Sequence, residues 1–163
     1  MPKRARCPHC DRLFTRDRLD DHIRKCGART TNQGGVRGTR TVVVVDGNNV
    51  AHHLSPNGIP RVANLVLAQS SLLKAGLRSI VVVSAALKHK INNPEVLQEM
   101  IARREVIEAP RGTDDDLTVI KLAQSNNADI VSNDRFLGFL NRFPWLQSRL
   151  IKYRMTPSGL ILR

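Results

Sequence analysis

Residues 41–50 read TVVVVDGNNV, and this stretch decides the fold class. Its four consecutive valines form an apolar run that lacks the polar alternation of a half-exposed strand. Such a run predicts a strand at 41–45 that is buried on both faces, as in a parallel sheet covered by helices. Asp46 and Gly47 follow at once, so a polar turn is expected where this strand ends.

Apolar runs alternate with helical patterns along the rest of the chain. We predict strands at 79–83, 105–109 and 128–132, and helices at 60–74, from Asn93 onward and at 115–126. The final segments, 150–155 and 160–162, flank the turn TPSG and are expected to pair as a hairpin at the sheet edge. This alternation is typical of an α/β fold with a parallel sheet flanked by helices.

Aspartates gather at the predicted carboxyl ends of three of these strands. Five of the ten acidic residues after position 40 lie there: Asp46, Asp114, Asp115, Asp116 and Asp134. In an open parallel sheet this edge is where ligands bind, so these side chains are expected to converge. Clustered carboxylates repel one another unless cations lie between them, and oxygen ligands suit Mg²⁺ or Mn²⁺. The pattern predicts hydrolysis of a phosphodiester assisted by such a catalytic metal.

Each of these acids also has an ordinary structural interpretation. Asp114 and Asp134 are placed to cap helices, and Asp46 is a common turn residue. The convergence of three loops, rather than any single acid, favours the functional interpretation. Beside the acids, Asn49 is a candidate to fix a metal-bound water or to contact phosphate, and Lys121 to steer a phosphate or pair with an acid.

All three cysteines of the chain lie within its first 26 residues. With His22 they give the spacing Cys7-x2-Cys10, eleven residues, then His22-x3-Cys26, which is typical of a structural, four-coordinate zinc site. We therefore predict a zinc finger at 1–26 that binds one Zn²⁺ and resembles fingers of the CCHC type. The alternative is a basic tail with incidental cysteines. Residues 27–40 are rich in glycine and arginine and predict a flexible basic linker before the domain at 41–163.

The chain is strongly basic, with a net charge of +12 and a pI near 10.8. Such an excess favours polyanionic partners, with nucleic acid first among them. The longest apolar runs are far shorter than a membrane-spanning helix, and no secretory leader is visible, so a cytoplasmic protein without membrane contact is expected.

Three segments together resemble the NYN branch of the PIN-like nucleases. They are VVVDGNNVA around Asp46, DD followed by IKLA after Asp115, and IVSND ending at Asp134. The likeness is strongest to the Regnase-type (MCPIP) zinc-finger endoribonucleases, and it spans about residues 41–155. It implies a PIN-like α/β fold that cleaves single-stranded RNA with Mg²⁺ or Mn²⁺. It also implies an acidic quartet of Asp46, Asp115, Asp116 and Asp134, with Asp114 as an extra acid.

Two features depart from that family. Its members carry a CCCH finger after the nuclease domain, whereas the CCHC spacing here precedes it, so RNA targets do not transfer. The region between the second strand and the paired acids is also short, which leaves the basic surface that guides substrate undefined. The candidates for that surface are Arg111, Arg135, Lys88, Lys90 and Arg142, with ordinary solvated charges as the alternative.

Other functions stay open from the sequence. A nucleic-acid-binding protein with a non-catalytic acidic crevice and a PIN-like nuclease that cuts DNA both fit the same residues. A hydrolase or phosphotransferase acting on small molecules fits less well, because no glycine-rich phosphate loop follows the first strand. The finger is predicted to bind nucleic acid or a protein partner.

Overall fold

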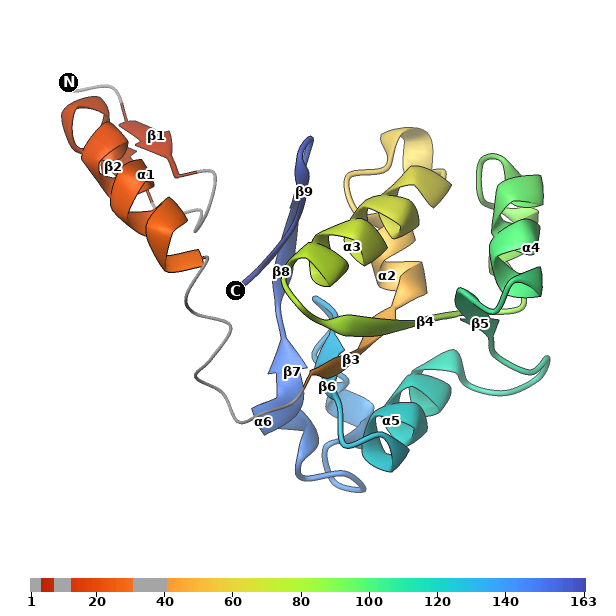
Figure 1. Cartoon of the computed structure of the whole chain (residues 1–163). Coiled ribbons are helices and arrows are strands. Elements are labelled where there is room, and N and C mark those ends of the chain that lie inside the picture. Colours follow the sequence, from red (N-terminus) through yellow and green to blue (C-terminus); the bar gives the residue numbers. More distant parts are fainter. Residues whose placement is uncertain (1–3, 8–12, 31–40) are drawn as a thin grey trace. The chain divides into compact units, whose positions relative to one another are not determined.

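The computed structural model describes residues 4–7, 13–30 and 41–163 (Figure 1). The chain divides into two compact units, one before residue 40 and one covering Arg40–Leu162, and each is described by itself. No helix within the described ranges is long and apolar enough to cross a membrane.

The small unit is a two-stranded hairpin followed by a helix. Strand β1 (Arg4–Arg6) pairs antiparallel with β2 (Leu13–Thr15), and helix α1 (Arg16–Thr30) follows directly. Cys7 comes straight after β1 and is buried, and the ring of Phe14 stacks on His22 with centroids 3.9 Å apart. Cys10 and the side chain of Cys26 lie outside the described residues, so the zinc ligand set stays a prediction.

The helix of the small unit is longer than expected. It continues through Thr30, so the first four residues of the predicted linker are helical. Gly27 is the single strong helix breaker in that segment, and Ala28 and Arg29 are good helix formers that extend a helix once it has started. Residues 31–40 of the predicted linker lie outside the described residues.

The large unit is built on a five-stranded sheet in which all strands run parallel. The spatial order is β5-β4-β3-β6-β7, so the first strand of the unit lies at the centre. The strands are β3 (Val42–Asp46), β4 (Arg78–Val83), β5 (Val106–Glu108), β6 (Asp129–Val131) and β7 (Leu150–Ile151). The predicted α/β class with a parallel sheet is confirmed.

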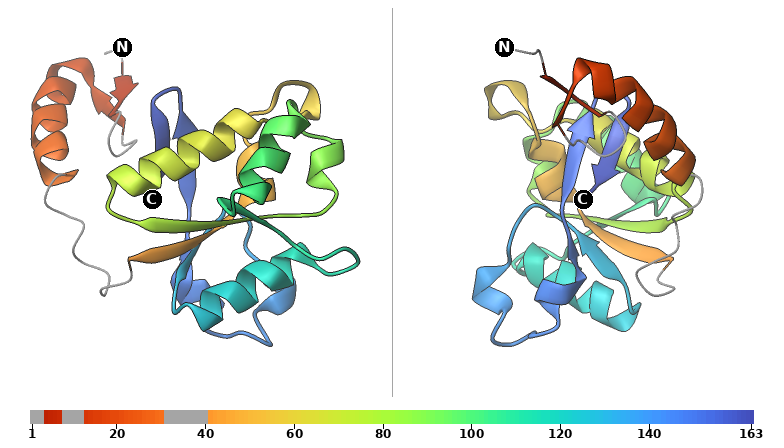
Figure 2. Two further views of the ribbon diagram at one scale, coloured as in Figure 1. Left: turned by 45° about the vertical axis from the view of Figure 1, so that its right-hand side comes forward. Right: turned by 90° about the vertical axis from the view of Figure 1, so that its left-hand side faces the viewer.

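Helices cover both faces of the sheet (Figure 2). On one face Val43, Val45 and Val81 pack in a core with α2, α3 and α4, and on the other Val44 and Ile130 pack against α5. The β3 valines therefore point alternately into two cores, which explains why that run has no polar positions. The helices are α2 (Gly47–His52), α3 (Val62–Lys74), α4 (Pro94–Ala102), α5 (Asp115–Ser125) and α6 (Leu146–Arg149).

The predicted C-terminal hairpin forms, but it is separate from the main sheet and its first strand is shorter than expected. The segment at 150–155 divides at Lys152: β7 joins the main sheet beside β6, whereas β8 (Tyr153–Thr156) pairs with β9 (Gly159–Leu162) in a separate two-stranded sheet. At the division the Lys152 ammonium donates to the backbone carbonyls of Asn133 and Asp134. The amide of the buried Tyr153 donates to Asn133 Oδ1 instead of to a carbonyl of a neighbouring strand. The hairpin of β8 and β9 packs on α3 (Figure 2).

Candidate functional site

The order of the strands creates a crevice at the carboxyl ends of β3 and β6. The chain moves from β3 to β4 and β5 on one side and then returns to β6 and β7 on the other, so the topology switches between these two strands. Ligands of open α/β sheets bind at such a point. Asp46 is the last residue of β3, and Ser132 directly follows β6. The sheet thus places both side chains at the switch point.

A glycine allows helix α2 to begin directly at this crevice. A Cβ atom on Gly47 would lie 2.5 Å from the Val82 carbonyl oxygen and 2.7 Å from a Val83 methyl group. Only a residue without a side chain therefore fits between β3 and β4 at this position. The close approach brings the two asparagines that follow, Asn48 and Asn49, to the sheet edge.

Asp46 is the most deeply buried acid of the site, with 4% of its surface exposed. Its Oδ2 accepts a hydrogen bond from Ser132 Oγ at 2.9 Å, and its Oδ1 accepts from the Asn49 amide at 3.3 Å. Burial raises the pKa of Asp46, and the charges of Asp115 and Asp134 add to the rise, whereas the two hydrogen bonds oppose it. Asp46 is thus held rigidly in a place that disfavours its own charge.

The three consecutive aspartates have different surroundings at the start of α5. Asp114 Oδ1 accepts from the Asp116 amide at 3.0 Å, so Asp114 is the N-cap of the helix. Asp115 Oδ2 accepts from Asn48 Nδ2 at 3.1 Å. Burial raises the pKa of Asp116 to about 7, with further contributions from the charges of Asp46, Asp115, Asp114 and Asp134.

Asp134 completes the group from the loop after β6. Its Oδ1 accepts from the Phe136 amide at 2.8 Å, and its own amide donates to Ser132 Oγ at 3.1 Å. Ser132 therefore links the Asp134 backbone to the Asp46 carboxylate. The structure brings together the acids that the sequence predicted to meet. The charges of Asp115 and Asp134 act on the pKa of Asp46, and the charges of Asp46, Asp114, Asp115 and Asp134 act on the pKa of Asp116.

The chemistry of this donor set fits a hard divalent cation. Among the residues that the structure describes, no three His, Cys, Asp or Glu side chains form a ready-made metal cage. Mg²⁺ does not require one, since it usually keeps several waters and binds through one or two carboxylates. The charges of the neighbouring acids add to the effect of burial on the pKa of Asp116, and a cation between these carboxylates would offset their repulsion.

A network of asparagines and a tyrosine supports the acids, and sequence reasoning found only one member of it. Asn49 Oδ1 accepts from Tyr153 OH at 2.7 Å and from the Asn133 amide at 3.0 Å, so this oxygen is already engaged within the protein. Asn133 Oδ1 accepts in turn from the Tyr153 amide at 3.1 Å. Asn48 joins the Ser84 amide, after β4, to Asp115. The adjacent asparagines after a strand-end aspartate were the available signal.

Some of the basic residues predicted to bind substrate lie beside the acidic residues, and others do not. Arg111 and Asp115 line one pocket, Arg135 directly follows Asp134, and both arginines are exposed. Lys121 is exposed in the middle of α5, and within the described part of the chain it forms no hydrogen bond or ion pair with the acidic residues. Lys88 is paired with Glu108 at 3.5 Å.

Lys152 is a cation of the site that sequence reasoning missed. Its Nζ donates at 2.9 Å to the carbonyl oxygens of Asn133 and Asp134. Burial lowers the pKa of Lys152, Arg135 adds to this effect, and the charge of Asp134 opposes it. This cation fixes the loop that carries Asp134.

Comparison with known proteins agrees with this architecture. A family model described as the Zc3h12a-like ribonuclease NYN domain matches residues 39–160. No curated protein matches the chain.

The chain is also similar to solved structures of one plant protein. It is similar to nuclear proteinaceous RNase P 2 (PRORP2) from A. thaliana, with a TM-score of 0.61 and 14% identity over 99% of the chain. A second structure of nuclear protein-only RNase P 2 from Arabidopsis thaliana gives a TM-score of 0.60 and 13% identity over 100% of the chain. The chain spans 42% of the length of each of these structures, and at this identity the likeness concerns the fold.

Proposed function

The chain belongs to the Zc3h12a-like ribonuclease NYN domain family, and we propose that it is a divalent-metal-dependent endoribonuclease that cleaves single-stranded RNA. One observation carries the proposal: Asp46, Asp115, Asp116 and Asp134 come from three loops to the topological switch point of the sheet, where burial and the charges of neighbouring acids raise the pKa of Asp46 and of Asp116. Raised pKa values of buried carboxylates in a crevice are typical of functional sites.

The four aspartates would hold Mg²⁺ or Mn²⁺. When bound, such an ion polarises the phosphate, lowers the pKa of a bound water and offsets charge on the leaving oxygen. The protein's own contribution is to fix the carboxylates beforehand. Ser132 orients Asp46, Asn48 orients Asp115, and Lys152 holds the loop of Asp134. A site that is already in place does not have to reorganise during the reaction.

The basic residues around this crevice would bind the RNA backbone. Arg111 and Arg135 are exposed on the loops that also carry Asp115 and Asp134. Asn49 and Lys121 remain proposed substrate-binding residues. Because Asn49 Oδ1 already accepts from Tyr153, the Asn49 side chain would contact a phosphate or water through its Nδ2. The net charge of +12 supports a polyanionic substrate.

We also propose one structural Zn²⁺ in the small unit, bound by Cys7, Cys10, His22 and Cys26. The hairpin-and-helix order and the burial of Cys7 support this ligand set. The finger would deliver the nuclease to nucleic acid or to a protein partner.

Cleavage of end-labelled single-stranded RNA, double-stranded RNA and matched single-stranded DNA, each with Mn²⁺, Mg²⁺ or EDTA, tests the proposal. The full chain is compared with a double variant, Asp115→Asn with Asp116→Asn, and with Glu95→Gln plus Glu99→Gln as a matched control on α4. We expect metal-dependent cleavage of single-stranded RNA that the first variant loses and the control retains. Binding without cleavage under every metal condition would instead identify a non-catalytic nucleic-acid-binding protein, and cleavage of DNA alone would identify a DNA nuclease.

A further inference from the structure

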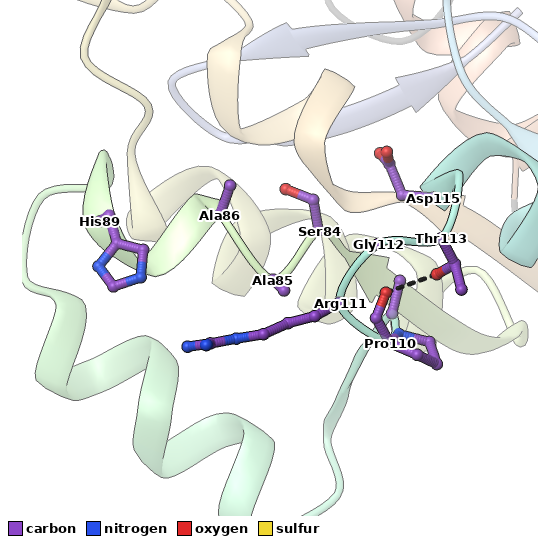
Figure 3. Close-up of a pocket in the computed structure, with 10 residues that line it drawn as sticks. Ser84, Ala85, Ala86, His89, Pro110, Arg111, Gly112, Thr113 and Asp115 are labelled. Atoms are coloured by element: carbon purple, nitrogen blue, oxygen red, sulfur yellow. Dashed lines mark hydrogen bonds between the residues drawn. The ribbon is translucent and has the colours of Figure 1, made fainter.

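A pocket of about 470 Å³ opens beside the acidic cluster, at the carboxyl ends of β4 and β5 (Figure 3). Its volume falls within the range of about 300–1,000 Å³ that small-molecule sites occupy. Asp115 lies at one end of it and His89 at the other, and the Arg111 side chain extends along it away from Asp115. The pocket therefore begins at a proposed metal ligand and leads to a basic end.

The lining of the pocket combines an apolar surface with a basic end. The apolar part of the lining consists of small side chains, those of Ala85, Ala86, Ala109 and Pro110. Within the described part of the chain, neither the Arg111 guanidinium nor the His89 ring has a hydrogen-bond or ion-pair partner, whereas the nearby Lys88 is already paired with Glu108. The basic end is thus available to an anionic group from outside the protein.

We propose that this pocket binds the nucleotide adjacent to the scissile phosphate, an inference that rests on the proposed ribonuclease function. A nucleotide has the matching order of groups: a phosphate, then a sugar and base with large apolar surface, then a second phosphate. The scissile phosphate lies at the acidic end, the sugar and base lie on the alanines, and the next phosphate lies at Arg111 and His89.

The lining also sets how selective the pocket is. Recognition of a particular base needs side-chain amides, carboxylates or arginines placed at its edge, or an aromatic ring that stacks on it. Beyond Asp115, Arg111 and His89, the lining polar side chains are the hydroxyls of Ser84 and Thr113, and the Thr113 hydroxyl already donates to the Pro110 carbonyl. Because the proposal places Asp115 at the scissile phosphate and Arg111 and His89 at the next phosphate, no other lining side chain of these kinds is left to read a base. The pocket therefore contributes affinity and position rather than sequence readout.

The decisive experiment combines variants of the full chain with abasic RNA. The substrate is a short single-stranded RNA with one mapped cleavage site, in which each nucleotide near that site is replaced in turn by an abasic spacer. Ala86→Trp fills the pocket from an exposed position, and Ala102→Trp makes the same change at an exposed position outside it.

We expect the wild type to lose about five- to tenfold in kcat/KM at one position adjacent to the cleaved bond, because the base no longer covers the apolar lining. Ala86→Trp lowers kcat/KM on intact RNA by a similar factor and shows no further loss with the spacer at that position. Ala102→Trp behaves as the wild type. Thermal melts of both variants test whether the fold is retained.

A second pair of variants tests the basic end. Arg111→Ala is expected to raise KM several-fold with kcat retained, and its effect disappears when the phosphate beyond the abasic position is replaced by an uncharged methylphosphonate. Arg78→Ala removes an exposed arginine at the amino end of β4, whereas the pocket lies at its carboxyl end, and this variant leaves KM unchanged.

The outcomes separate this inference from the function on which it rests. If the wild type cleaves RNA but the spacer lowers kcat/KM equally in the wild type and Ala86→Trp, the pocket does not bind a nucleotide and the ribonuclease assignment stands. The same conclusion follows if no position is sensitive to the spacer. If the wild type cleaves no RNA with any metal, the proposed function and this inference both fail.

Discussion

Asn48 connects the carboxylate of Asp115 to the end of a neighbouring strand. Its Nδ2 donates to Asp115 Oδ2 at 3.1 Å, and its Oδ1 accepts from the Ser84 amide at 3.0 Å. One side chain therefore fixes an acid 67 positions away in sequence and ties it to the end of β4.

Replacing Asn48 with alanine should lower kcat by about tenfold or more, since residues that orient metal ligands typically contribute 10–100-fold to metal affinity or activity. The unpaired Ser84 amide should also lower the free energy of unfolding by roughly 1–3 kcal/mol. Steady-state cleavage across a Mn²⁺ titration and a urea melt measure these effects. Unchanged kcat and unchanged Mn²⁺ dependence would show that Asn48 is structural only.

Substitution of Asp114 and of Asp116 by Asn should affect cleavage very differently, although the two residues are only two positions apart. Asn is as good an N-cap as Asp, so Asp114→Asn keeps the hydrogen bond to the Asp116 amide and should retain activity within about threefold and stability within about 0.5 kcal/mol. Asp116→Asn removes a proposed metal ligand and should abolish cleavage. Side-by-side rates and melts check the pair. Loss of activity in Asp114→Asn would place the extra acid among the functional ones.

The acidic site should make the metal-free chain less stable as pH rises. The folded-state pKa of Asp116 is raised from 3.8 to about 7, and that of Asp46 is also raised, so the folded state binds more protons than the unfolded state between those values. Stability from these groups is present at low pH and is lost as pH rises toward 7.

Thermal unfolding in EDTA should therefore show Asp116→Asn gaining Tm over the wild type at pH 7.5 but not at pH 4.5. Adding Mg²⁺ should reduce the Tm difference between Asp116→Asn and the wild type at pH 7.5, because the ion stabilises the wild type more than the variant. The same Tm difference between the two proteins at both pH values would contradict the raised pKa of Asp116.

The zinc assignment makes a quantitative prediction for the small unit. The full chain should contain one zinc per molecule, and Cys26→Ala should lose it, because a structural site needs all four ligands. Metal content by mass spectrometry measures this directly. Cleavage of a short RNA should be retained in the variant, since the acidic cluster belongs to the other unit. Zinc that persists after Cys26→Ala would show that the ligand set is wrong.

The sequence predicted those parts of the molecule that depend on local pattern. The valine run before Asp46 predicted a strand buried on both faces, and parallel strands necessarily bring their carboxyl ends to one edge, so the meeting of Asp46, Asp115 and Asp134 followed. The cap at Asp114 was also readable, because capping involves residues two or three positions apart.

Contacts between distant segments were not predictable in this way. The bond from Tyr153 to Asn49 joins positions 104 apart, and no periodicity or spacing marks it. Lys152, at which the last predicted strand divides, likewise donates to carbonyls of another loop that lie beside it only in the folded chain. The supporting network, unlike the acids, is a product of tertiary structure.

Tyr153 gives the sharpest test of that network. It is buried, and its hydroxyl donates to Asn49 Oδ1 at 2.7 Å, so Tyr153→Phe removes one hydrogen bond and almost no volume. The variant should lose about 1 kcal/mol of unfolding free energy. Asn49→Ala should lose more, because it leaves both the Tyr153 hydroxyl and the Asn133 amide without their acceptor.

A double-mutant cycle of Tyr153→Phe and Asn49→Ala, followed by urea melts and by kcat, separates positioning from direct contact. If Tyr153 acts through Asn49, the tyrosine change should cost little once Asn49 is absent, in stability and in kcat alike. The same relation in both readouts would make Tyr153 a positioning residue that acts on the crevice from β8. Additive losses in kcat would instead indicate that Tyr153 acts on the acids without Asn49. Burial raises the pKa of Tyr153 and the charge of Asp46 adds to the rise, so an electrostatic effect on Asp46 is then expected.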